Sequence, residues 1–187
     1  MKTDQVYDKL IFTGPVGAGK TTAIASISDT PPVRTDACAT DMTSARKPET
    51  TVALDYGVLR LDDGGKLHLY GTPGQERFDF MWEILVRGGI GLVLLLDNTR
   101  TDPFQDMRFF IQRFHPFIDA TGLVVGVTRM DLKATPSLEA YYNSLEQLGI
   151  RAPVLEIDAR RRTDVVLLVQ ALLFHLNPGV LMEESDA

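Results

Sequence analysis

The sequence has little cysteine, no excess of basic residues and no long hydrophobic run. Its 187 residues include one cysteine, Cys38, which excludes an internal disulfide and fits a reducing compartment such as the cytoplasm. The formal net charge is −6, so we expect no broad electrostatic grip on nucleic acid or on an anionic membrane. The longest apolar block, residues 90–96, has the length of a strand rather than of a membrane span.

Signals that direct a chain to a membrane are also missing. There is no N-terminal signal pattern, no glycine after Met1 to myristoylate and no cysteine near Ala187 to prenylate. The three histidines are scattered, and none lies at metal-ligand spacing from a second candidate. We therefore expect a cytoplasmic protein that is monomeric alone and has no direct membrane anchor.

What the sequence does contain is a phosphate loop. Residues 14–21, Gly-Pro-Val-Gly-Ala-Gly-Lys-Thr, fit the pattern G-x-x-x-x-G-K-[ST] at every specified position, between an apolar strand-like run and a helical pattern. Glycines let backbone N–H groups surround a polyphosphate, and the helix N-terminus adds partial positive charge. Lys20 should reach the β- and γ-phosphates, and Thr21 should ligate Mg²⁺. The nucleotide-binding candidates here are Gly14, Pro15, Val16, Gly17, Ala18, Gly19, Lys20, Thr21 and Thr22.

Apolar strand-like runs alternate with helical patterns, which favours an α/β fold with a mostly parallel sheet. The predicted strands are 8–13, 52–61, 66–70, 90–97, 122–128 and 153–157. The predicted helices are 20–28, 77–87, 103–118, 136–148 and 163–176. Residues 62–65, Asp-Asp-Gly-Gly, are a hairpin signal, so one flanking strand should be antiparallel to its neighbours. Residues 29–50 are predicted as a functional loop, and residues from about 178 to 187 as a flexible acidic tail.

Three further motifs each follow a predicted strand. They are Gly-Thr-Pro-Gly-Gln-Glu-Arg-Phe at 71–78, Thr-Arg-Met-Asp at 128–131 and Asp-Ala-Arg at 158–160. In open α/β sheets a ligand binds beyond the carboxyl ends of the strands, so loops that are distant in sequence should meet at the phosphate loop. Four motifs in this order are far more specific than any one of them.

With these motifs the chain resembles the Ras-like small GTPases over nearly its full length. It is most similar to the bacterial MglA-type and conservon-type GTPases, cytosolic signalling switches that work with roadblock/LC7 partner proteins. The residues that carry the resemblance are 51–57, 70–78 and 80–88. It implies a P-loop NTPase fold: a Ras-like three-layer sandwich with a six-stranded mixed sheet and about five helices, forming one G domain over residues 1–187. It also implies GTP or GDP as ligand, Mg²⁺ as cofactor, and slow, activator-dependent GTP hydrolysis.

The resemblance also implies roles for single residues. Thr51 would contact Mg²⁺ and the γ-phosphate, the Gly74 backbone N–H would touch the γ-phosphate, and Gln75 would orient the attacking water. The catalytic candidates are thus Gln75, Lys20 and Thr51, and the metal candidates are Thr21 and Thr51. MglA-type enzymes are thought to supply an arginine just before the switch threonine, but Thr50 stands there, and Arg46 is the nearest substitute.

Base recognition rests on Asp131. Its carboxylate can accept hydrogen bonds from guanine N1–H and from the 2-amino group, whereas adenine lacks both donors. The family pattern is Asn/Thr-Lys-x-Asp, so Thr128 matches and Arg129 replaces lysine. At 158–160 the family usually has Ser-Ala-Lys. Of Asp158, Ala159 and Arg160 only Ala159 matches, and its backbone N–H would bind guanine O6.

Gly71 is the largest departure from the family pattern. Most Ras-like proteins have an aspartate there that holds Mg²⁺ through a water, although the conservon-like relatives also carry glycine. Mg²⁺ would then be held chiefly by Thr21 and, in the GTP state, by Thr51. We therefore expect weak coupling to Mg²⁺ and slow intrinsic hydrolysis.

Two other functions stay open at this point. A nucleotide-dependent binding scaffold with negligible catalysis is favoured by Gly71 and Thr50 and opposed by Gln75. An ATP-dependent P-loop enzyme is opposed by Asp131. Either core packing or a switch-dependent partner surface would explain three apolar residues at helical spacing: Phe78, Met81 and Trp82. The arginine run at 160–162 is too short to indicate nucleic-acid binding.

Overall fold

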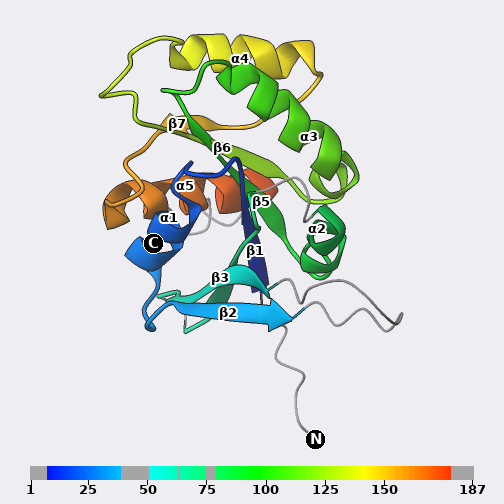
Figure 1. Ribbon diagram of the computed structural model, residues 1–187, viewed down its shortest axis with the longest axis vertical. Coiled ribbons are helices and arrows are strands. Elements are labelled where there is room, and N and C mark those ends of the chain that lie inside the picture. The colour runs from blue at the N-terminus through cyan, green and yellow to red at the C-terminus, as the bar shows by residue number, and fades with distance from the viewer. Residues whose placement is uncertain (1–7, 39–50, 63, 75–78, 178–187) are drawn as a thin grey trace, which may run out of the picture.

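A seven-stranded sheet of order β2-β3-β4-β1-β5-β6-β7 runs through the molecule, with helices on both faces (Figure 1). The computed structural model describes residues 8–38, 51–62, 64–74 and 79–177. The strands are β1 (Asp8–Thr13), β2 (Val33–Cys38), β3 (Thr51–Arg60), β4 (Lys66–Gly71), β5 (Gly91–Asp97), β6 (Leu123–Thr128) and β7 (Val154–Glu156). The helices are α1 (Lys20–Ile27), α2 (Asp79–Leu85), α3 (Pro103–Ala120), α4 (Leu138–Gln147) and α5 (Arg162–Leu176). The predicted class, a Ras-like P-loop NTPase sandwich, is confirmed.

The sheet is mixed, as predicted. β1 pairs in parallel with β4 and β5, and the parallel order continues through β6 and β7. β3 is antiparallel to β4, and the turn between them is closed by backbone hydrogen bonds between Leu61 and Gly65 and between Gly64 and Leu61. Because the carboxyl ends of the parallel strands lie at one edge of the sheet, the loops that follow them gather there.

The seventh strand, β2, corrects the sequence-based prediction. Residues 29–50 were expected to form a loop and the sheet to have six strands, but Val33–Cys38 pair with β3 from Val33↔Tyr56 to Cys38↔Thr51. β2 lies at the edge of the sheet, and its sequence, Val-Arg-Thr-Asp-Ala-Cys, has no apolar alternation to mark it as a strand. Its pairing with β3 therefore determines its structure. The rest of the expected loop, 39–50, and the expected tail, 178–187, lie outside the described residues.

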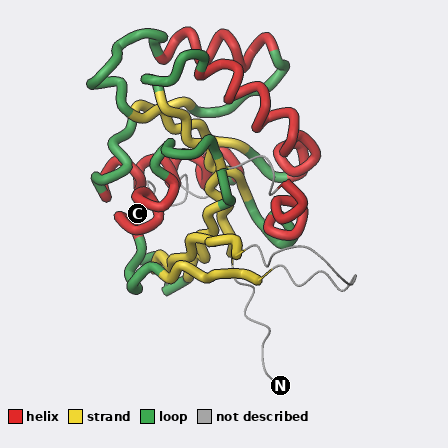
Figure 2. The backbone as a smooth tube through the Cα atoms, viewed as in Figure 1, coloured by secondary structure: helices red, strands yellow, loops and turns green. Residues whose placement is uncertain are grey.

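The core has two halves, one on each face of the sheet. Figure 2 shows the helices that lie on these faces. Successive residues of β1 show the division: Leu10 and Phe12 pack toward α1 and α5, while Ile11 packs toward α2 and α3. This follows from the two-residue period of a strand. α3 supplies one side of the second half with buried residues at helical spacing: Met107, Phe110, Ile111, Phe114 and Ile118. Within the described part of the chain, no helix is both long and apolar enough to cross a membrane.

Trp82 is a core residue. Its side chain is 2% exposed, and its ring stacks on Phe114 with a centroid distance of 5.2 Å. Its indole Nε1 donates a hydrogen bond to the backbone oxygen of Pro73 at 3.1 Å. Core packing, one of the two alternatives left open, is therefore correct for Trp82, and the same side chain ties α2 to the loop after β4. Met81 is partly buried, and Phe78 lies outside the described residues.

Trp82 provides a test of this packing. Trp82→Ala should lower the free energy of unfolding by about 3–5 kcal/mol, because it opens a cavity among aromatic rings and removes the bond to Pro73. Phe174→Ala is the control, since Phe174 is 51% exposed on α5 and should change stability by about 0.5 kcal/mol or less. Urea unfolding followed by circular dichroism measures both. A Trp82→Ala variant as stable as the Phe174→Ala variant would contradict the described core.

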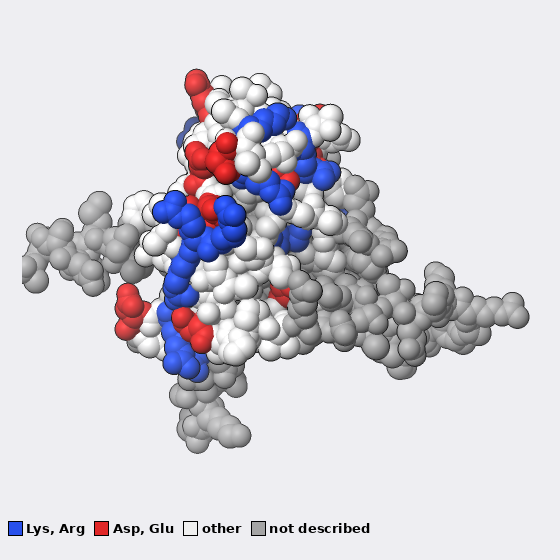
Figure 3. All heavy atoms as spheres, turned by 60° about the vertical axis from the view of Figure 1, so that its left-hand side comes forward, with Lys and Arg blue, Asp and Glu red and all other residues white. Residues whose placement is uncertain are grey.

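The arginine run that follows β7 is paired with carboxylates. Figure 3 shows a strip of basic side chains on the face it presents, with acidic side chains beside it. The ion pairs are Arg160 with Asp158 at 2.7 Å, Arg161 with Asp164 at 3.8 Å and Arg162 with Asp29 at 2.9 Å. Arg162 also donates to the backbone oxygen of Ile27 at 2.8 Å, so it joins the start of α5 to the end of α1. These contacts give residues 160–162 a local structural role.

Candidate nucleotide-binding site

The predicted phosphate loop links the end of β1 to the start of α1. Three of its glycines have positive φ: Gly14 at 137°, Gly17 at 82° and Gly19 at 101°. At Gly14 the space also requires glycine, because a Cβ there would lie 2.1 Å from the backbone oxygen of Leu95 in β5. The loop is therefore fixed by conformations that L side chains rarely adopt, and it leads directly into the N-terminus of α1.

Lys20 lies within this loop rather than in solvent. It is the first residue of α1, its side chain is buried, and its Nζ donates to the backbone oxygens of Gly14 at 2.6 Å and Pro15 at 2.8 Å. Burial lowers the pKa of Lys20 to about 8, while the charge of Asp55 acts in the opposite direction. The ammonium group is thus held at the phosphate loop.

Gly74 approaches the same loop from the end of β4. A Cβ added at Gly74 would lie 2.7 Å from the backbone nitrogen of Val16 and 2.8 Å from Lys20 Nζ. The absence of a side chain therefore lets the two loops meet. The structure brings together the phosphate-loop candidates and Gly74, and backbone donors and an ammonium group from separate segments form a cradle that suits an anion.

A pocket of about 280 Å³ lies beside the phosphate loop. Its lining comes from the phosphate loop and α1, from the end of β6 and from the segment after β7. The lining residues are Ala18, Gly19, Thr22, Thr128, Arg129, Asp131, Leu132, Ile157, Asp158, Ala159 and Arg160. All the base-recognition candidates therefore meet at one pocket, whose volume is close to the lower end of the range for small-ligand sites, about 300–1,000 Å³.

Thr128 connects the base side of this pocket to the phosphate side. It is buried at the end of β6, and its Oγ1 donates to the backbone oxygens of Leu96 at 3.1 Å and Ala18 at 3.3 Å. Asp131 follows three residues later in an exposed turn on the pocket lining. The hydroxyl of Thr128 thus ties the end of β6, just before the turn that carries Asp131, to the phosphate loop.

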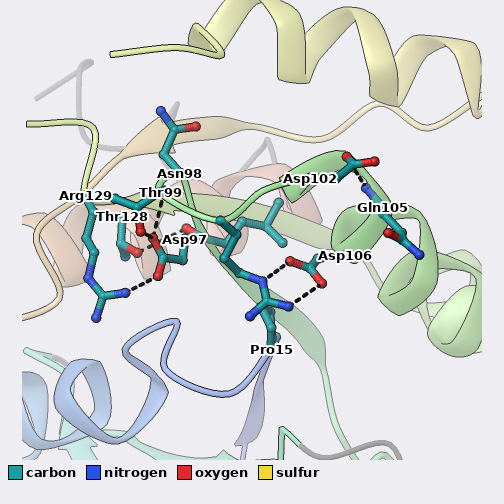
Figure 4. Close-up of polar contacts among 12 residues, drawn as sticks. Pro15, Asp97, Asn98, Thr99, Asp102, Gln105, Asp106, Thr128 and Arg129 are labelled. Carbon is teal, nitrogen blue, oxygen red and sulfur yellow. Dashed lines mark hydrogen bonds and ion pairs between the residues drawn. The ribbon is translucent and has the colours of Figure 1, made fainter. Parts of the chain in front are cut away.

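Arg129 is held in place by Asp97, a contact that the sequence did not reveal. Arg129 has a positive φ of 59°, and its guanidinium pairs with the Asp97 carboxylate at the end of β5 (Figure 4). Burial raises the pKa of Asp97, but hydrogen bonds from Thr99 and the charge of Arg129 outweigh it, so the net pKa is lowered. Asp97 also caps its own turn by accepting a hydrogen bond from the Thr99 backbone N–H at 2.9 Å. Arg129 therefore forms a fixed wall of the pocket.

The segment after β7 closes the pocket from the other side. Arg160 donates to Asp158 through both its backbone nitrogen and its guanidinium, and these hydrogen bonds lower the pKa of Asp158 to about 2. Ala159 is buried against the phosphate loop, since a Cβ added at Gly19 would lie 3.0 Å from the Ala159 Cβ. The small size of both residues lets the two loops touch.

Leu132 and Ile157 were not predicted as site residues. Leu132 follows Asp131 directly and is 71% exposed, although it lines the pocket. An apolar residue directly after a polar base-recognition residue could have identified Leu132 as a site residue, because a purine needs apolar surface as well as hydrogen bonds. Ile157 follows β7 directly and is buried, and the sequence placed it at the end of the predicted strand 153–157.

Of the two predicted metal residues, the structure places Thr21 beside a carboxylate that was not predicted. Thr21 Oγ1 donates to Asp55 Oδ2 of β3 at 2.5 Å. Thr51 begins β3, four residues before Asp55, which places it about 13 Å away along an extended strand, because β3 is paired throughout with β2 and β4. Gln75 lies outside the described residues. Hydroxyl and carboxylate oxygens suit Mg²⁺, so the pair at Thr21 fits that ion. Among the described residues, no three His, Cys, Asp or Glu side chains form a metal-ligating cluster.

Comparison with known proteins shows which family the chain belongs to. Residues 12–173 match the model of a family described as conserved hypothetical ATP binding protein. Among curated proteins, the chain is similar to the uncharacterized protein MJ1339 of Methanocaldococcus jannaschii, with 33% identity over 100 residues, 54% of this chain and 56% of that protein.

Two Ras-related proteins are also similar. Rab-1A of Dictyostelium discoideum is 25% identical over 164 residues, 84% of this chain and 74% of that protein. Rab-8A of Gallus gallus is 28% identical over 130 residues, 67% of this chain and 57% of that protein. The alignments thus span between about half and three quarters of these relatives' own lengths. The chain is homologous to the Ras-related small GTPases, and, since the family model covers most of its sequence, it belongs to the family of conserved hypothetical ATP binding proteins.

Proposed function

We propose that this protein binds GTP and GDP with Mg²⁺, hydrolyses GTP slowly and acts as a molecular switch. The observation that carries the proposal is the pocket in which Asp131 and Ala159 lie beside the phosphate loop. A carboxylate and a backbone N–H at these places match the N1–H, 2-amino and O6 groups of guanine. A site that bound only phosphates would need neither this carboxylate nor this backbone N–H.

The proposal departs from the wording of the family description, which names ATP. Adenine offers no donor at N1 and has no 2-amino group, so an adenine in this pocket would leave Asp131 without the partners that guanine supplies. Leu132 and the wall formed by Arg129 would serve either base. Asp131 is therefore the residue that favours guanine.

In hydrolysis, a water attacks the γ-phosphorus of GTP and the bond to the β-phosphate oxygen breaks, which releases GDP and phosphate. Positioning and electrostatics carry most of such a reaction. Lys20 would hold the β- and γ-phosphates at the loop, and the Gly74 backbone N–H would hold the γ-phosphate, consistent with their approach in the structure. Bound Mg²⁺ would neutralise charge on the same oxygens. Gln75 would orient the water, a role that rests on the resemblance.

The partner is proposed from the resemblance. The segments 51–57 and 70–78 are similar to those of the MglA-type and conservon-type GTPases, so we place the protein in that group, in the cytoplasm, with a roadblock/LC7-type partner that reads the nucleotide state. Pull-down of a roadblock protein encoded beside this chain, with GDP or a non-hydrolysable GTP analogue loaded, tests this placement. If the roadblock protein binds equally in the two nucleotide states, or binds in neither, the placement is contradicted.

Single-turnover hydrolysis of γ-labelled GTP, with and without the partner, separates the switch from a scaffold with negligible catalysis. The wild type should release phosphate. Gln75→Leu should slow release about 10- to 100-fold with little change in GTP affinity, because it removes the group that positions water. Gln105→Leu, an exposed position on α3, is the matched control. If the wild-type protein releases no phosphate even with its partner, the protein is a nucleotide-dependent scaffold with negligible catalysis.

A further inference from the structure

Asp55 of β3 lies beside the phosphate loop, where its carboxylate contacts Thr21. Its Oδ2 accepts a hydrogen bond from Thr21 Oγ1 at 2.5 Å. Burial lowers the pKa of Lys20, and the charge of Asp55 offsets part of that effect. Thr21 is the hydroxyl that the phosphate-loop pattern assigns to Mg²⁺. The carboxylate thus contacts the expected metal ligand and interacts electrostatically with the expected phosphate ligand.

The sheet explains why this carboxylate comes from β3. The antiparallel register of β3 and β4 places Asp55 directly opposite Gly71, the position where most Ras-like proteins have their metal-anchoring aspartate. A Cβ added at Gly71 would lie 3.0 Å from the Asp55 Cβ and 3.2 Å from its Oδ2. Paired positions point to the same face of a sheet, so a side chain at 71 would compete with Asp55 for the same space.

We propose that Asp55 anchors Mg²⁺ in place of an aspartate at position 71, and that Gly71 is glycine because Asp55 fills that space. The inference rests on the proposed nucleotide-binding function. Mg²⁺ is usually held by one or two carboxylates together with substrate phosphates and waters. Neighbouring ligands of an octahedral Mg²⁺ lie about 2.9 Å apart, so the oxygens of Thr21 and Asp55 need little movement to bind the ion or its water.

This proposal changes the expectation drawn from Gly71 alone. From the sequence, Mg²⁺ would be held chiefly by Thr21 and, in the GTP state, by Thr51, and coupling between Mg²⁺ and nucleotide would be weak. With Asp55 in the site, the carboxylate is not lost but has moved to the adjacent strand. Mg²⁺ should therefore slow nucleotide release as it does when an aspartate stands at position 71.

The test measures Mg²⁺ coupling without hydrolysis. Release of a fluorescent GDP analogue is followed as free Mg²⁺ is varied, and the Mg²⁺ concentration that gives half-maximal slowing is determined. Asp55→Asn should raise that concentration about 10- to 100-fold while the release rate in EDTA stays within about threefold of wild type. Asp62→Asn, an exposed aspartate in the hairpin turn, is the control and should leave the curve unchanged.

A carboxylate swap separates a metal role from a structural one. The double variant Asp55→Gly with Gly71→Asp keeps one carboxylate and one glycine at the paired positions, and it should recover most of the Mg²⁺ sensitivity lost in Asp55→Asn. If Asp55→Asn binds GDP with an unchanged Mg²⁺ midpoint, the metal role of Asp55 is wrong while the proposed function stands. If that variant does not fold, a double variant without Mg²⁺ sensitivity has the same meaning. Wild-type protein that binds no GDP at any Mg²⁺ concentration overturns the proposed function instead.

Discussion

Replacing Asp131 by asparagine should lower the affinity for GDP by about 10²- to 10⁴-fold and make xanthosine diphosphate the preferred ligand. The carboxylate would accept two charge-assisted hydrogen bonds from guanine, each contributing about 1.5–3 kcal/mol. An asparagine side chain can accept only one of these two hydrogen bonds, and its NH₂ group then faces the second donor of guanine. Xanthine has an oxygen at position 2, which accepts from that NH₂. The expected result is therefore a reversal of preference and not merely a loss of binding.

Titration of fluorescent GDP and competition with xanthosine diphosphate measure the effect. Asp119→Asn is the matched control, because Asp119 is an exposed residue of α3 paired only with His115 in the described structure and far from the pocket lining. It should bind GDP as the wild type does. If Asp131→Asn keeps wild-type GDP affinity, Asp131 does not read the base, and the guanine assignment fails.

Gly14→Ala should lower the free energy of unfolding by about 3–5 kcal/mol and abolish nucleotide binding. Two costs combine: the φ of 137° is unfavourable for alanine, and its Cβ would lie 2.1 Å from the backbone oxygen of Leu95. Relief of this contact requires the phosphate loop to move away from β5. The loop could then no longer present its N–H groups and Lys20 to a polyphosphate.

Gly17→Ala is the control within the same loop. Gly17 also has a positive φ, 82°, but a Cβ added there meets nothing within 4 Å. Its stability cost should be about 1 kcal/mol, from backbone conformation alone. Urea unfolding of both variants, together with GDP titration, checks the prediction. Equal stability losses in the two variants would show that the contact between Gly14 and β5 does not fix the loop.

Much of the fold could be predicted because its central strands are buried on both faces. β5 and β6 are buried at every residue, and such runs are recognised in sequence as parallel strands. Helix ends were less certain. For α4 the predicted start was 136, whereas Ser137 caps the helix by accepting from the Ala140 backbone and Leu138 begins it. The edge strand β2 could not be predicted, since its partner strand and not its own pattern determines it.

The residues of the candidate site likewise fall into those that could be predicted from the sequence and those that could not. Thr128, Asp131 and Ala159 could be placed from sequence because loops after parallel strands converge at one sheet edge. The contacts of Asp97 with Arg129 and of Asp55 with Thr21 could not. Each depends on how a residue of one strand is registered against a distant segment. That information lies in the pairing of the sheet and in no short motif.

Competition between GDP and ADP for the wild-type protein at saturating Mg²⁺ tests directly whether the pocket beside the phosphate loop recognises guanine. The ratio of the two dissociation constants measures the contribution of the base, because the phosphates and the ribose are common to both ligands. We predict that GDP binds at least about 100-fold more tightly, as expected when two hydrogen bonds to a carboxylate are lost. Equal or tighter binding of ADP would contradict the claim.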